Sequence, residues 1–428
     1  MEIEDMKIED EVTKSALLVG VNLGDGEDFE HSMAELKSLA EACGMKVVGC
    51  VLQNLPRVNQ ALYIGTGKVE EVRREAEEVD AHIIIFDNTL SPTQLRNLQE
   101  ELHVTVLDRT ALILEIFSMR AQTREAKMQV EVARLQYMLP RLVGLRSALG
   151  RQGGTSGGLS NKGSGEKKLE LDKRHIEHRL SELRKELEEV GRERDTQRKQ
   201  RMSSGIPRVA LVGYTNAGKS TLMNAMLDAY VGDVTKKVLE QDMLFATLDT
   251  TVRKITPKGH KPFLLSDTVG FIHKLPHNLV KAFRATLEEA KYADVLLEVI
   301  DYADEHYKEH RKVTEETLRE IGAEGIPIIY IFNKAEHSMP IPMVKENKIY
   351  MSAKSKIGLE ELLQLMETVL AQDYIACEML LPYAQGSLIA YLTENADIKK
   401  MEYIEEGTKI QLSCKPADYQ KYQSYVIK

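Results

Sequence analysis

The stretch Gly213-Tyr-Thr-Asn-Ala-Gly-Lys-Ser220 decides the fold of this chain. It follows the apolar run Val209-Ala-Leu-Val212 and precedes a segment, Thr221 to Leu227, that is typical of a helix. A strand, a G-x-x-x-x-G-K-S loop and a helix in this order form a phosphate-binding loop, in which backbone N–H groups at a helix N-terminus surround phosphate oxygens. The alternative is a glycine-containing turn before an ordinary helix, but all three elements fall where the motif needs them. The stretch therefore predicts a nucleotide site made by Gly213, Tyr214, Thr215, Asn216, Ala217, Gly218, Lys219 and Ser220.

Two side chains of this loop carry the expected chemistry. The ammonium group of Lys219 neutralises charge on the β- and γ-phosphates, which makes Lys219 a candidate catalytic residue. The hydroxyl group of Ser220 is a candidate ligand of Mg²⁺.

Two further motifs, Asp267-Thr-Val-Gly270 and Asn333-Lys-Ala-Glu336, each come directly after an apolar run. In an open parallel sheet, ligands bind at the carboxyl ends of the strands, so both motifs are expected beside the phosphate-binding loop. Asp267 is expected to approach Mg²⁺ through water, and the backbone N–H of Gly270 is expected to meet the γ-phosphate as a second catalytic group. The three strands that deliver these loops are predicted at residues 209–212, 263–266 and 328–332.

The Asn-Lys-x-acid motif indicates that the base is guanine. An acidic side chain at Glu336 accepts hydrogen bonds from the N1 and N2 hydrogens of guanine, which adenine cannot match. Ser352-Ala-Lys354 follows another short apolar run and is expected to complete the base pocket. The expected nucleotide contacts in these motifs are Asp267, Thr268, Val269, Gly270, Asn333, Lys334, Ala335, Glu336, Ser352, Ala353 and Lys354.

A second Mg²⁺ ligand is expected between the phosphate-binding loop and Asp267, where several threonines follow one another. Thr247 is our candidate for this ligand and for a third catalytic group. Thr250 and Thr251 are alternatives, and a strand is a further alternative because β-branched residues favour strands. The expected nucleotide contacts here are Phe245, Ala246, Thr247, Leu248 and Asp249.

The chain resembles the HflX family of ribosome-associated, translation-factor-class GTPases. The resemblance extends over nearly the whole chain, on both sides of the phosphate-binding loop. It rests on Tyr63-Ile-Gly-Thr-Gly-Lys68, Leu90-Ser-Pro-Thr-Gln-Leu-Arg-Asn97, Val106-Leu-Asp-Arg-Thr110, Ala126-Lys-Met-Gln-Val-Glu131, Leu139-Pro-Arg-Leu142, Phe245-Ala-Thr-Leu-Asp249, Asp267-Thr-Val-Gly-Phe-Ile272 and Leu275-Pro-His277.

The resemblance implies a Mg²⁺-dependent GTPase that binds the large ribosomal subunit and its rRNA in the GTP form and separates or rescues stalled ribosomes. It also favours Thr247 over its rivals. Three departures from the family pattern stand out. Glu336 replaces the family's aspartate, which bears on guanine selectivity, and Gly163-Ser-Gly-Glu-Lys-Lys-Leu-Glu170 replaces a G-P-G-E-T-Q-L-E pattern. Thr250-Thr-Val252 replaces the usual Pro-Thr-Thr after Asp249, which bears on the stiffness of the switch loop.

Hydrolysis is expected to use water as the nucleophile, with Lys219, Mg²⁺ and the loop amides stabilising the spreading charge. Phe271 stands where Ras-like proteins carry a glutamine, and it has no group that can orient water. Intrinsic turnover is therefore expected to be slow, with a partner, potassium or another residue completing the site. The family resemblance implies that a ribosomal partner is the activator. Two alternatives are a nucleotide-stabilised RNA-binding scaffold or ribosome-assembly factor with little turnover, and a hydrolase of relaxed base choice.

The fold class expected is a multidomain α/β protein. Apolar runs that alternate with helical stretches predict an N-terminal βα domain at residues 1–115, and a phosphate-binding-loop domain with a mostly parallel sheet is expected at 206–373. Between them, residues 116–205 are expected to form a helical hairpin, and residues 374–428 a small α+β domain.

The predicted hairpin is helical to about Leu149, breaks in Gly150–Gly165 and resumes from Lys167 to about Lys199. Leucine, isoleucine and valine recur in its second helix at spacings typical of a helix that packs on a partner, at Leu169, Ile176, Leu180, Leu183, Leu187 and Val190. From Met119 to Met202 there are 20 Lys/Arg against 12 Asp/Glu, a net charge of +8. The basic helices and the glycine-rich tip could contact RNA, or form a solvated surface and a plain connector. The family resemblance implies RNA contact.

The composition of all 428 residues, with 43% hydrophobic and 29% charged residues, is that of a soluble protein of several modules. No apolar run is long enough to span a membrane, and the acidic N-terminus lacks the features of a signal peptide, so a cytoplasmic location is expected. The net charge of −9 argues against general polyanion binding, and no DNA partner is expected. The four cysteines form no Cys-x-x-Cys pair and are expected to be reduced thiols, and the chain is expected to be a monomer.

Overall fold

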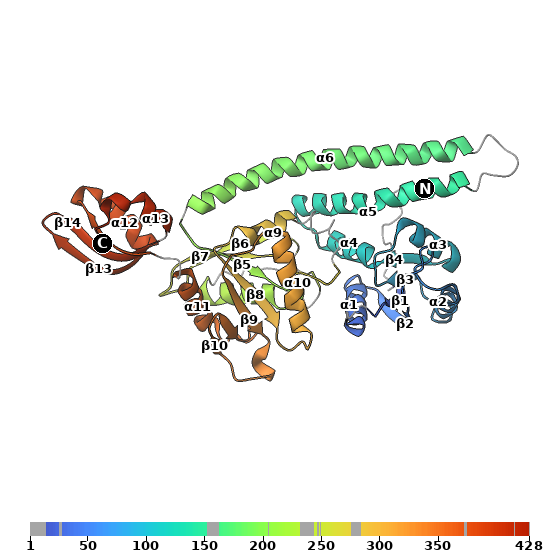
Figure 1. Cartoon of the computed structure of the whole chain (residues 1–428), viewed down its shortest axis with the longest axis horizontal. Helices are drawn as coiled ribbons and strands as arrows, with labels where there is room; N and C mark the ends of the chain where they lie inside the picture. Colours follow the sequence, from blue (N-terminus) through green and yellow to red (C-terminus); the bar gives the residue numbers. More distant parts are fainter. Residues whose placement is uncertain are drawn as a thin grey trace. The chain divides into compact units, whose positions relative to one another are not determined.

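The computed structural model of the chain describes residues 14–24, 28–151, 162–203, 205–231, 244–245, 248, 250–274, 284–371, 375–414 and 416–427 (Figure 1). The chain divides into two compact units. The first comprises Met1–Arg192, Gln241–Asp249 and Val269–Thr286, and the second comprises Glu193–Glu240, Thr250–Thr268 and Leu287–Lys428. Two short segments that flank Asp267 in sequence therefore belong with the N-terminal part of the chain.

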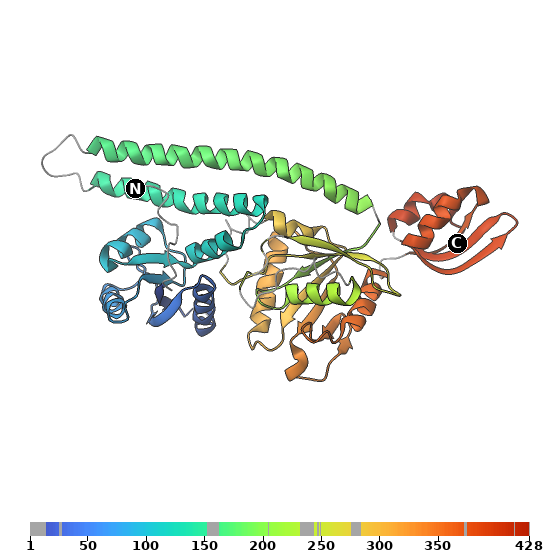
Figure 2. The same cartoon turned by 180° about the vertical axis from the view of Figure 1, so that it is seen from behind.

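A four-stranded parallel sheet in the order β2-β1-β3-β4 forms the N-terminal half of the first unit. Helices α2 and α3 cover one face and α1 and α4 the other (Figures 1 and 2). All four residues of β3 are buried, as expected for a strand covered on both faces. The elements are β1 (Ser15–Asn22), α1 (Phe29–Ala42), β2 (Lys46–Asn54), α2 (Thr66–Glu78), β3 (Ile83–Phe86), α3 (Pro92–Leu102), β4 (Thr105–Asp108) and α4 (Arg109–Arg120).

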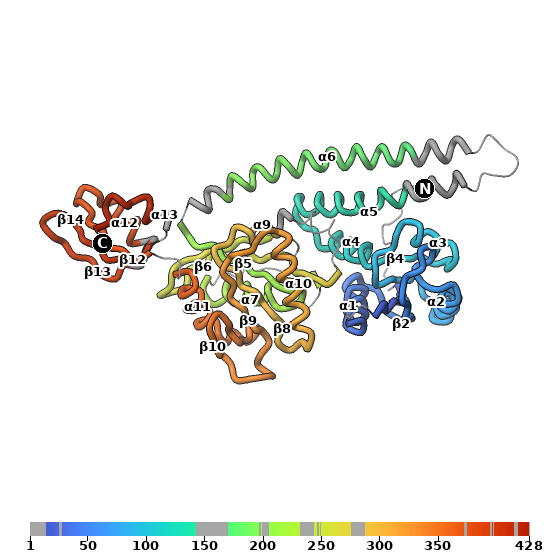
Figure 3. The backbone as a smooth tube through the Cα atoms, viewed as in Figure 1, coloured from blue at the N-terminus to red at the C-terminus, as the bar shows by residue number. Residues whose placement is uncertain are grey.

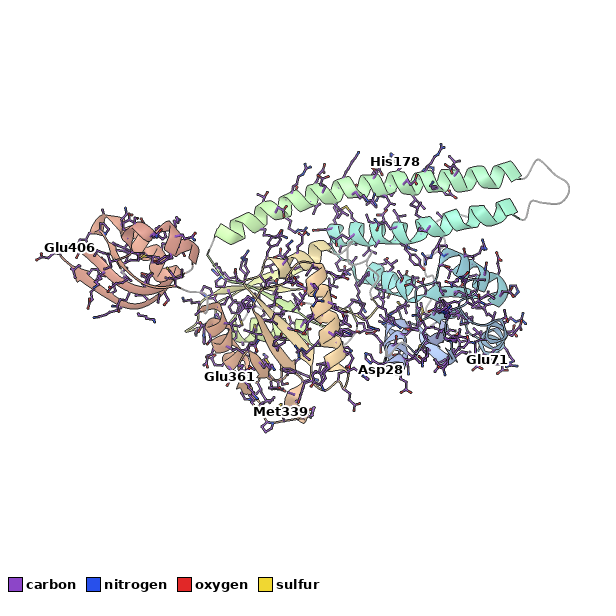
Figure 4. The ribbon with its side chains drawn as sticks, viewed as in Figure 1. Asp28, Glu71, His178, Met339, Glu361 and Glu406 are labelled. Atoms are coloured by element: carbon purple, nitrogen blue, oxygen red, sulfur yellow. The ribbon has the colours of Figure 1, made fainter. Side chains whose placement is uncertain are left out.

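Side-chain caps fix where several of these helices begin. Asp28, which Figure 4 labels, accepts a hydrogen bond from the backbone N–H of His31 at 3.0 Å at the start of α1. Asp108 accepts one from Ala111 at 2.8 Å at the start of α4. Such caps satisfy N–H groups that have no partner within the helix.

The predicted helical hairpin is present as α5 (Arg124–Arg151) and α6 (Lys162–Ser203), but the helix expected from Ile116 to Leu149 is wrong as a single element. α4 ends at Arg120 and α5 begins at Arg124, because the Thr123 hydroxyl caps α5 by accepting from the backbone N–H of Ala126 at 3.1 Å. The apolar stripe packs α6 on α5 as predicted, through Ile176, Leu180, Leu183, Leu187 and Val190 against Met128, Val132, Leu135 and Leu139. Nothing is described of residues 152–161 or of the Leu169 side chain.

A seven-stranded sheet in the order β10-β11-β9-β8-β5-β7-β6 forms the core of the second unit. Figure 3 traces the backbone of this part of the chain and labels β5, β6, β8, β9 and β10. All neighbouring strands are parallel except at the two edges, where β10 pairs antiparallel with β11 and β6 with β7, which confirms the mostly parallel sheet. The strands are β5 (Arg208–Val212), β6 (Thr251–Ile255), β7 (Phe263–Asp267), β8 (Val295–Asp301), β9 (Ile328–Asn333), β10 (Met343–Lys345) and β11 (Lys348–Tyr350). The helices are α7 (Lys219–Tyr230), α9 (Arg284–Lys291), α10 (Tyr307–Glu320), η2 (Ala335–His337) and α11 (Leu359–Ala371).

The main hydrophobic core of this unit lies between the sheet and the helices α7 and α11. Alternate residues of β8, Leu297 and Val299, face that core, whereas Glu298 between them contacts Arg311 of α10. α10 therefore lies on the opposite face of the sheet, and the carboxyl ends of five parallel strands share one edge.

The C-terminal part of the second unit is the α+β element that the sequence predicts. Its antiparallel sheet has the order β12-β14-β13. The elements are β12 (Ile375–Leu381), η3 (Tyr383–Gln385), α12 (Gly386–Asn395), β13 (Asp397–Ile404), β14 (Gly407–Cys414), α13 (Pro416–Lys421) and η4 (Gln423–Tyr425). All four cysteines are free thiols. Among the described helices, none combines the length and apolar character that crossing a membrane requires.

Candidate nucleotide-binding site

The phosphate-binding loop connects β5 to α7, and two of its glycines are required by their surroundings. Gly213 has a φ of +136°, and a Cβ atom there would lie 2.3 Å from the carbonyl oxygen of Val299. Gly218 has a φ of +98° at the N-terminus of α7, and its Cβ atom would lie 2.2 Å from Asn333 Nδ2. Only glycine fits both positions, so the loop lies tight against β8 and the β9 loop.

Lys219 begins α7 with a side chain that is almost fully buried. Its ammonium group donates hydrogen bonds to the carbonyl oxygens of Gly213, at 3.0 Å, and Tyr214, at 2.6 Å. Burial lowers the pKa of Lys219 to about 8, against the opposing effect of the Asp267 carboxylate. A positive group held this close to the loop is placed to meet phosphate oxygens.

Ser220 and Asp267 come together beside the loop. The Ser220 hydroxyl donates to Asp267 Oδ2 at 2.9 Å, and Asp267 is completely buried at the end of β7. The next residue, Thr268, is also buried, and its hydroxyl donates to the carbonyl oxygen of Leu211 at 2.6 Å. A hydroxyl group and a carboxylate side by side are oxygen ligands of the kind that Mg²⁺ prefers.

Asn333 joins the phosphate-binding loop to the expected base pocket. Its Nδ2 donates to the carbonyl oxygen of Ala217 at 2.9 Å, and its Oδ1 accepts from the backbone N–H of Ala353 at 2.9 Å. One buried side chain thus ties together the three motifs that begin at Gly213, Asn333 and Ser352. The side chain of Ser352 is buried in this arrangement, whereas Lys354 is exposed.

Lys334 has a partner that the sequence interpretation missed. Its ammonium group donates to Asp301 Oδ2 at 2.6 Å and to the carbonyl oxygen of Asn216 at 3.1 Å. Asp301 ends the buried strand β8, which lies between β5 and β9. The signal was available, because Asp301 follows an apolar run as Asp267 does.

Glu336 lies in the short helix η2, directly after Ala335, which is fully buried. Within the described part of the chain, the Oε2 atom of Glu336 is buried and has no hydrogen-bond partner. A buried carboxylate oxygen costs free energy unless a donor reaches it, so this atom is suited to accept from a base.

The remaining predicted contacts lie on the two short segments that belong to the first unit, Gln241–Asp249 and Val269–Thr286. Val269 and Gly270 belong to the first unit, as do Phe245 and Leu248, which are both buried. Phe271, at the position expected to lack a water-orienting group, is a buried side chain of the same unit. Ala246, Thr247 and Asp249 lie outside the described residues, so the choice of Thr247 as a Mg²⁺ ligand stays a prediction.

Known proteins match this chain over almost its full length. Three family descriptions match in succession: "GTP-binding GTPase N-terminal" at residues 30–118, "GTP-binding GTPase Middle Region" at 120–201 and "50S ribosome-binding GTPase" at 208–334. A curated protein named GTPase HflX from Lacrimispora saccharolytica is 43% identical over 93% of this chain and 92% of its own length. The chain belongs to the HflX family of GTPases.

One further HflX relative and one solved structure are also similar to this chain. The GTPase HflX of Caldanaerobacter subterraneus subsp. tengcongensis is 42% identical over 96% of this chain and 94% of its own length. A solved structure described as a complex of SsGBP with GDP is 28% identical, covers 84% of this chain and 99% of its own, and has a TM-score of 0.45. As a member of the HflX family, the chain binds and hydrolyses GTP.

Proposed function

We propose that the chain is a Mg²⁺-dependent GTPase that binds the large ribosomal subunit in its GTP form and separates or rescues stalled ribosomes. The single observation that carries the nucleotide part is Asn333, which links the phosphate-binding loop at Ala217 to the base pocket at Ala353. The ribosomal part is supported by the "50S ribosome-binding GTPase" description that matches residues 208–334.

In the proposed Mg²⁺ site, Ser220 and Thr247 are direct ligands and Asp267 approaches the ion through water. The residues present fit the ion, because the Ser220 hydroxyl and the Asp267 carboxylate lie 2.9 Å apart and offer oxygen atoms alone. When bound, Mg²⁺ neutralises charge that develops on the phosphate oxygens during phosphoryl transfer.

The chain's own residues supply the rest of the proposed chemistry. Lys219 exchanges its two loop carbonyls for phosphate oxygens and stabilises the transition-state charge. The backbone N–H of Gly270 holds the γ-phosphate, and Glu336 accepts from the guanine base. Because Phe271 has no polar group to orient water, we propose that a ribosomal partner completes the site.

Ribosome contact is assigned to the helical hairpin, whose sequence between Met119 and Met202 carries a net charge of +8. The proposal keeps four modules, at residues 1–115, 116–205, 206–373 and 374–428. It is supported by the three matched family segments, at residues 30–118, 120–201 and 208–334. We further propose that the protein is cytoplasmic and acts as a monomer.

The test is steady-state GTP turnover with and without purified large ribosomal subunits. We expect strong stimulation by the subunits, and loss of turnover in Ser220→Ala. Ser38→Ala is the matched control, because the Ser38 hydroxyl donates within α1, to the carbonyl oxygen of Ala34 at 3.1 Å. GTP binding without any stimulation would reject the ribosome-activated switch and leave an RNA-binding scaffold. Displacement of labelled GTP by ATP would instead indicate a hydrolase of relaxed base choice.

A further inference from the structure

The segment that follows Asp267 and Thr268 is held by the N-terminal unit. Val269–Thr286 belongs to that unit, and the side chains of Phe271 and Ile272 are each only 1% exposed. We propose that Lys274 and Asp87 are positioning residues for GTP hydrolysis, in which Asp87 acts from outside the GTP-binding domain by holding the segment that carries Gly270. This inference rests on the proposed role of Gly270 at the γ-phosphate.

The contact between the two side chains is short and well shielded from water. The Lys274 ammonium group donates to Asp87 Oδ2 at 2.8 Å and to the Ser32 hydroxyl oxygen at 3.0 Å. The Ser32 hydroxyl also donates to Asp87 Oδ2, at 2.8 Å. The Asp87 side chain is 0% exposed and that of Lys274 is 20% exposed. Water therefore screens this pair much less than a pair on the surface.

A second ion pair, with Arg109, also holds Asp87 in place. Arg109 Nη1 donates to Asp87 Oδ1 at 2.7 Å, and Arg109 Nη2 donates to Glu35. The cluster then contains two cations and two carboxylates. Burial by itself raises the pKa of Asp87, but the Arg109 and Lys274 cations more than offset it, so the pKa of Asp87 lies below its ordinary value. Asp87 is thus a fixed, charged acceptor for Lys274.

An independent contact anchors the other segment that joins the N-terminal unit. Gln241–Asp249 belongs to the same unit, and the ring of Phe245 packs edge-on against Phe117 of α4 with centroids 4.7 Å apart. Phe245 is 2% exposed. Phe245 and Lys274, which belong to the two segments expected to respond to the γ-phosphate, therefore each contact an N-terminal element.

The anchor lies near enough to Gly270 to restrict it. Lys274 is four residues beyond Gly270, and two of the intervening side chains are buried. A segment fixed in this way loses little conformational freedom when the transition state forms. Such pre-organisation raises kcat. Loss of the anchor should lower kcat and leave the binding of GDP, which has no γ-phosphate, unchanged.

The test compares Lys274→Met, Lys274→Arg and Asp87→Asn with the wild-type protein. Lys68→Met is a matched control, because Lys68 pairs with Glu71 of α2 (labelled in Figure 4), also at 2.8 Å, and its side chain is also 20% exposed. We expect kcat for GTP to fall about tenfold in Lys274→Met and Asp87→Asn. In these two variants, the Kd of a fluorescent GDP analogue and the KM for GTP should stay unchanged. The kcat of Lys68→Met should equal that of the wild-type protein.

Two results separate positioning from a purely structural role. Lys274→Arg, which keeps a cation, should restore most of the kcat, and the double variant Asp87→Asn/Lys274→Met should be no slower than either single variant. An unchanged or raised kcat in Lys274→Met, or an equal loss of GDP affinity, would overturn the inference. Should Asp87→Asn fail to fold, Lys274→Met and Lys274→Arg decide the matter alone. A wild-type protein that large ribosomal subunits do not stimulate would reject the proposed function but leave the comparison of basal kcat values intact.

Discussion

Replacing Glu298 by glutamine should remove the pH dependence of stability that this carboxyl group causes in the GTP-binding domain. Glu298 lies in the centre of β8 and is 1% exposed. Within the described part of the chain, neither of its carboxylate oxygens has a hydrogen-bond partner, and the nearest cation is Arg311, with Nε 3.9 Å from Oε1. Burial raises the pKa of Glu298 from 4.5 to about 8, although Arg311 opposes the shift.

The sign of the effect follows from proton binding. Between pH 4.5 and pH 8, the folded protein keeps a proton on Glu298 that the unfolded chain has released, so the free energy of unfolding falls as the pH rises. Linkage between these two pKa values gives a cost of about 1 kcal/mol at pH 5, about 3 kcal/mol at pH 7 and about 5 kcal/mol at pH 9. The change from pH 5 to pH 9 is then at most about 4 kcal/mol.

The assay is denaturant unfolding at pH 5, 7 and 9, followed through the transition of the GTP-binding domain. In Glu298→Gln, the free energy of unfolding should rise relative to wild type as the pH increases, and the variant should be the more stable protein at pH 9. The control is Glu315→Gln on α10, because Glu315 pairs with Arg311 at 3.2 Å but is 48% exposed. The same pH dependence in Glu298→Gln and wild type would refute the reasoning.

Three further predictions concern the nucleotide site, and the Kd of a fluorescent nucleotide checks each of them. Gly213→Ala should lower GDP affinity at least about tenfold, because the new Cβ atom meets a carbonyl oxygen at 2.3 Å; an unchanged Kd would show that the loop can move. Asp301→Ala should weaken GDP binding about tenfold, because Lys334 loses a 2.6 Å partner and its placement beside Asn216; equal affinity would mean that Asp301 is not needed to position Lys334. Glu336→Gln should weaken GTP binding about 100-fold through two lost charged hydrogen bonds and leave the affinity for ATP unchanged; a parallel loss of affinity for both nucleotides would contradict base reading by Glu336.

Much of the fold was predictable because local patterns determine it. The apolar runs before Gly213, Asp267 and Asn333 became β5, β7 and β9 within one residue of the predicted ends. The apolar stripe of α6 packs on α5, since a spacing near 3.5 residues leaves one face that must be buried. The break between α4 and α5 was missed, because the helical pattern continues across it and the boundary is marked by the Thr123 cap at the start of α5.

The site was predictable only as far as its motifs extend. The sequence motifs predict that the loops that begin at Gly213, Asn333 and Ser352 form one site. In the structure, the hydrogen bonds of Asn333 join these loops. Asp301 was missed because it belongs to no motif that we used, although its place at a strand end has the same physical meaning as that of Asp267. The division of the chain into units could not be predicted from the sequence, because contacts such as that of Lys274 with Asp87 join residues 187 positions apart.

Asp87 and Glu298 show why the state of a buried acid escapes a sequence. Both lie in or directly after an apolar strand and both are 1% exposed, yet the pKa of Asp87 is lowered and that of Glu298 is raised. The difference lies in their partners. Asp87 receives hydrogen bonds from Arg109, Lys274 and Ser32, which come from three separate segments, whereas Glu298 has one cation at 3.9 Å. Because Lys274 supplies part of the stabilisation of the Asp87 carboxylate, the pKa of Asp87 depends on whether the segment beyond Gly270 is in place. The pKa of Glu298 is set by burial, Arg311 and Glu315, and has no such dependence on that segment.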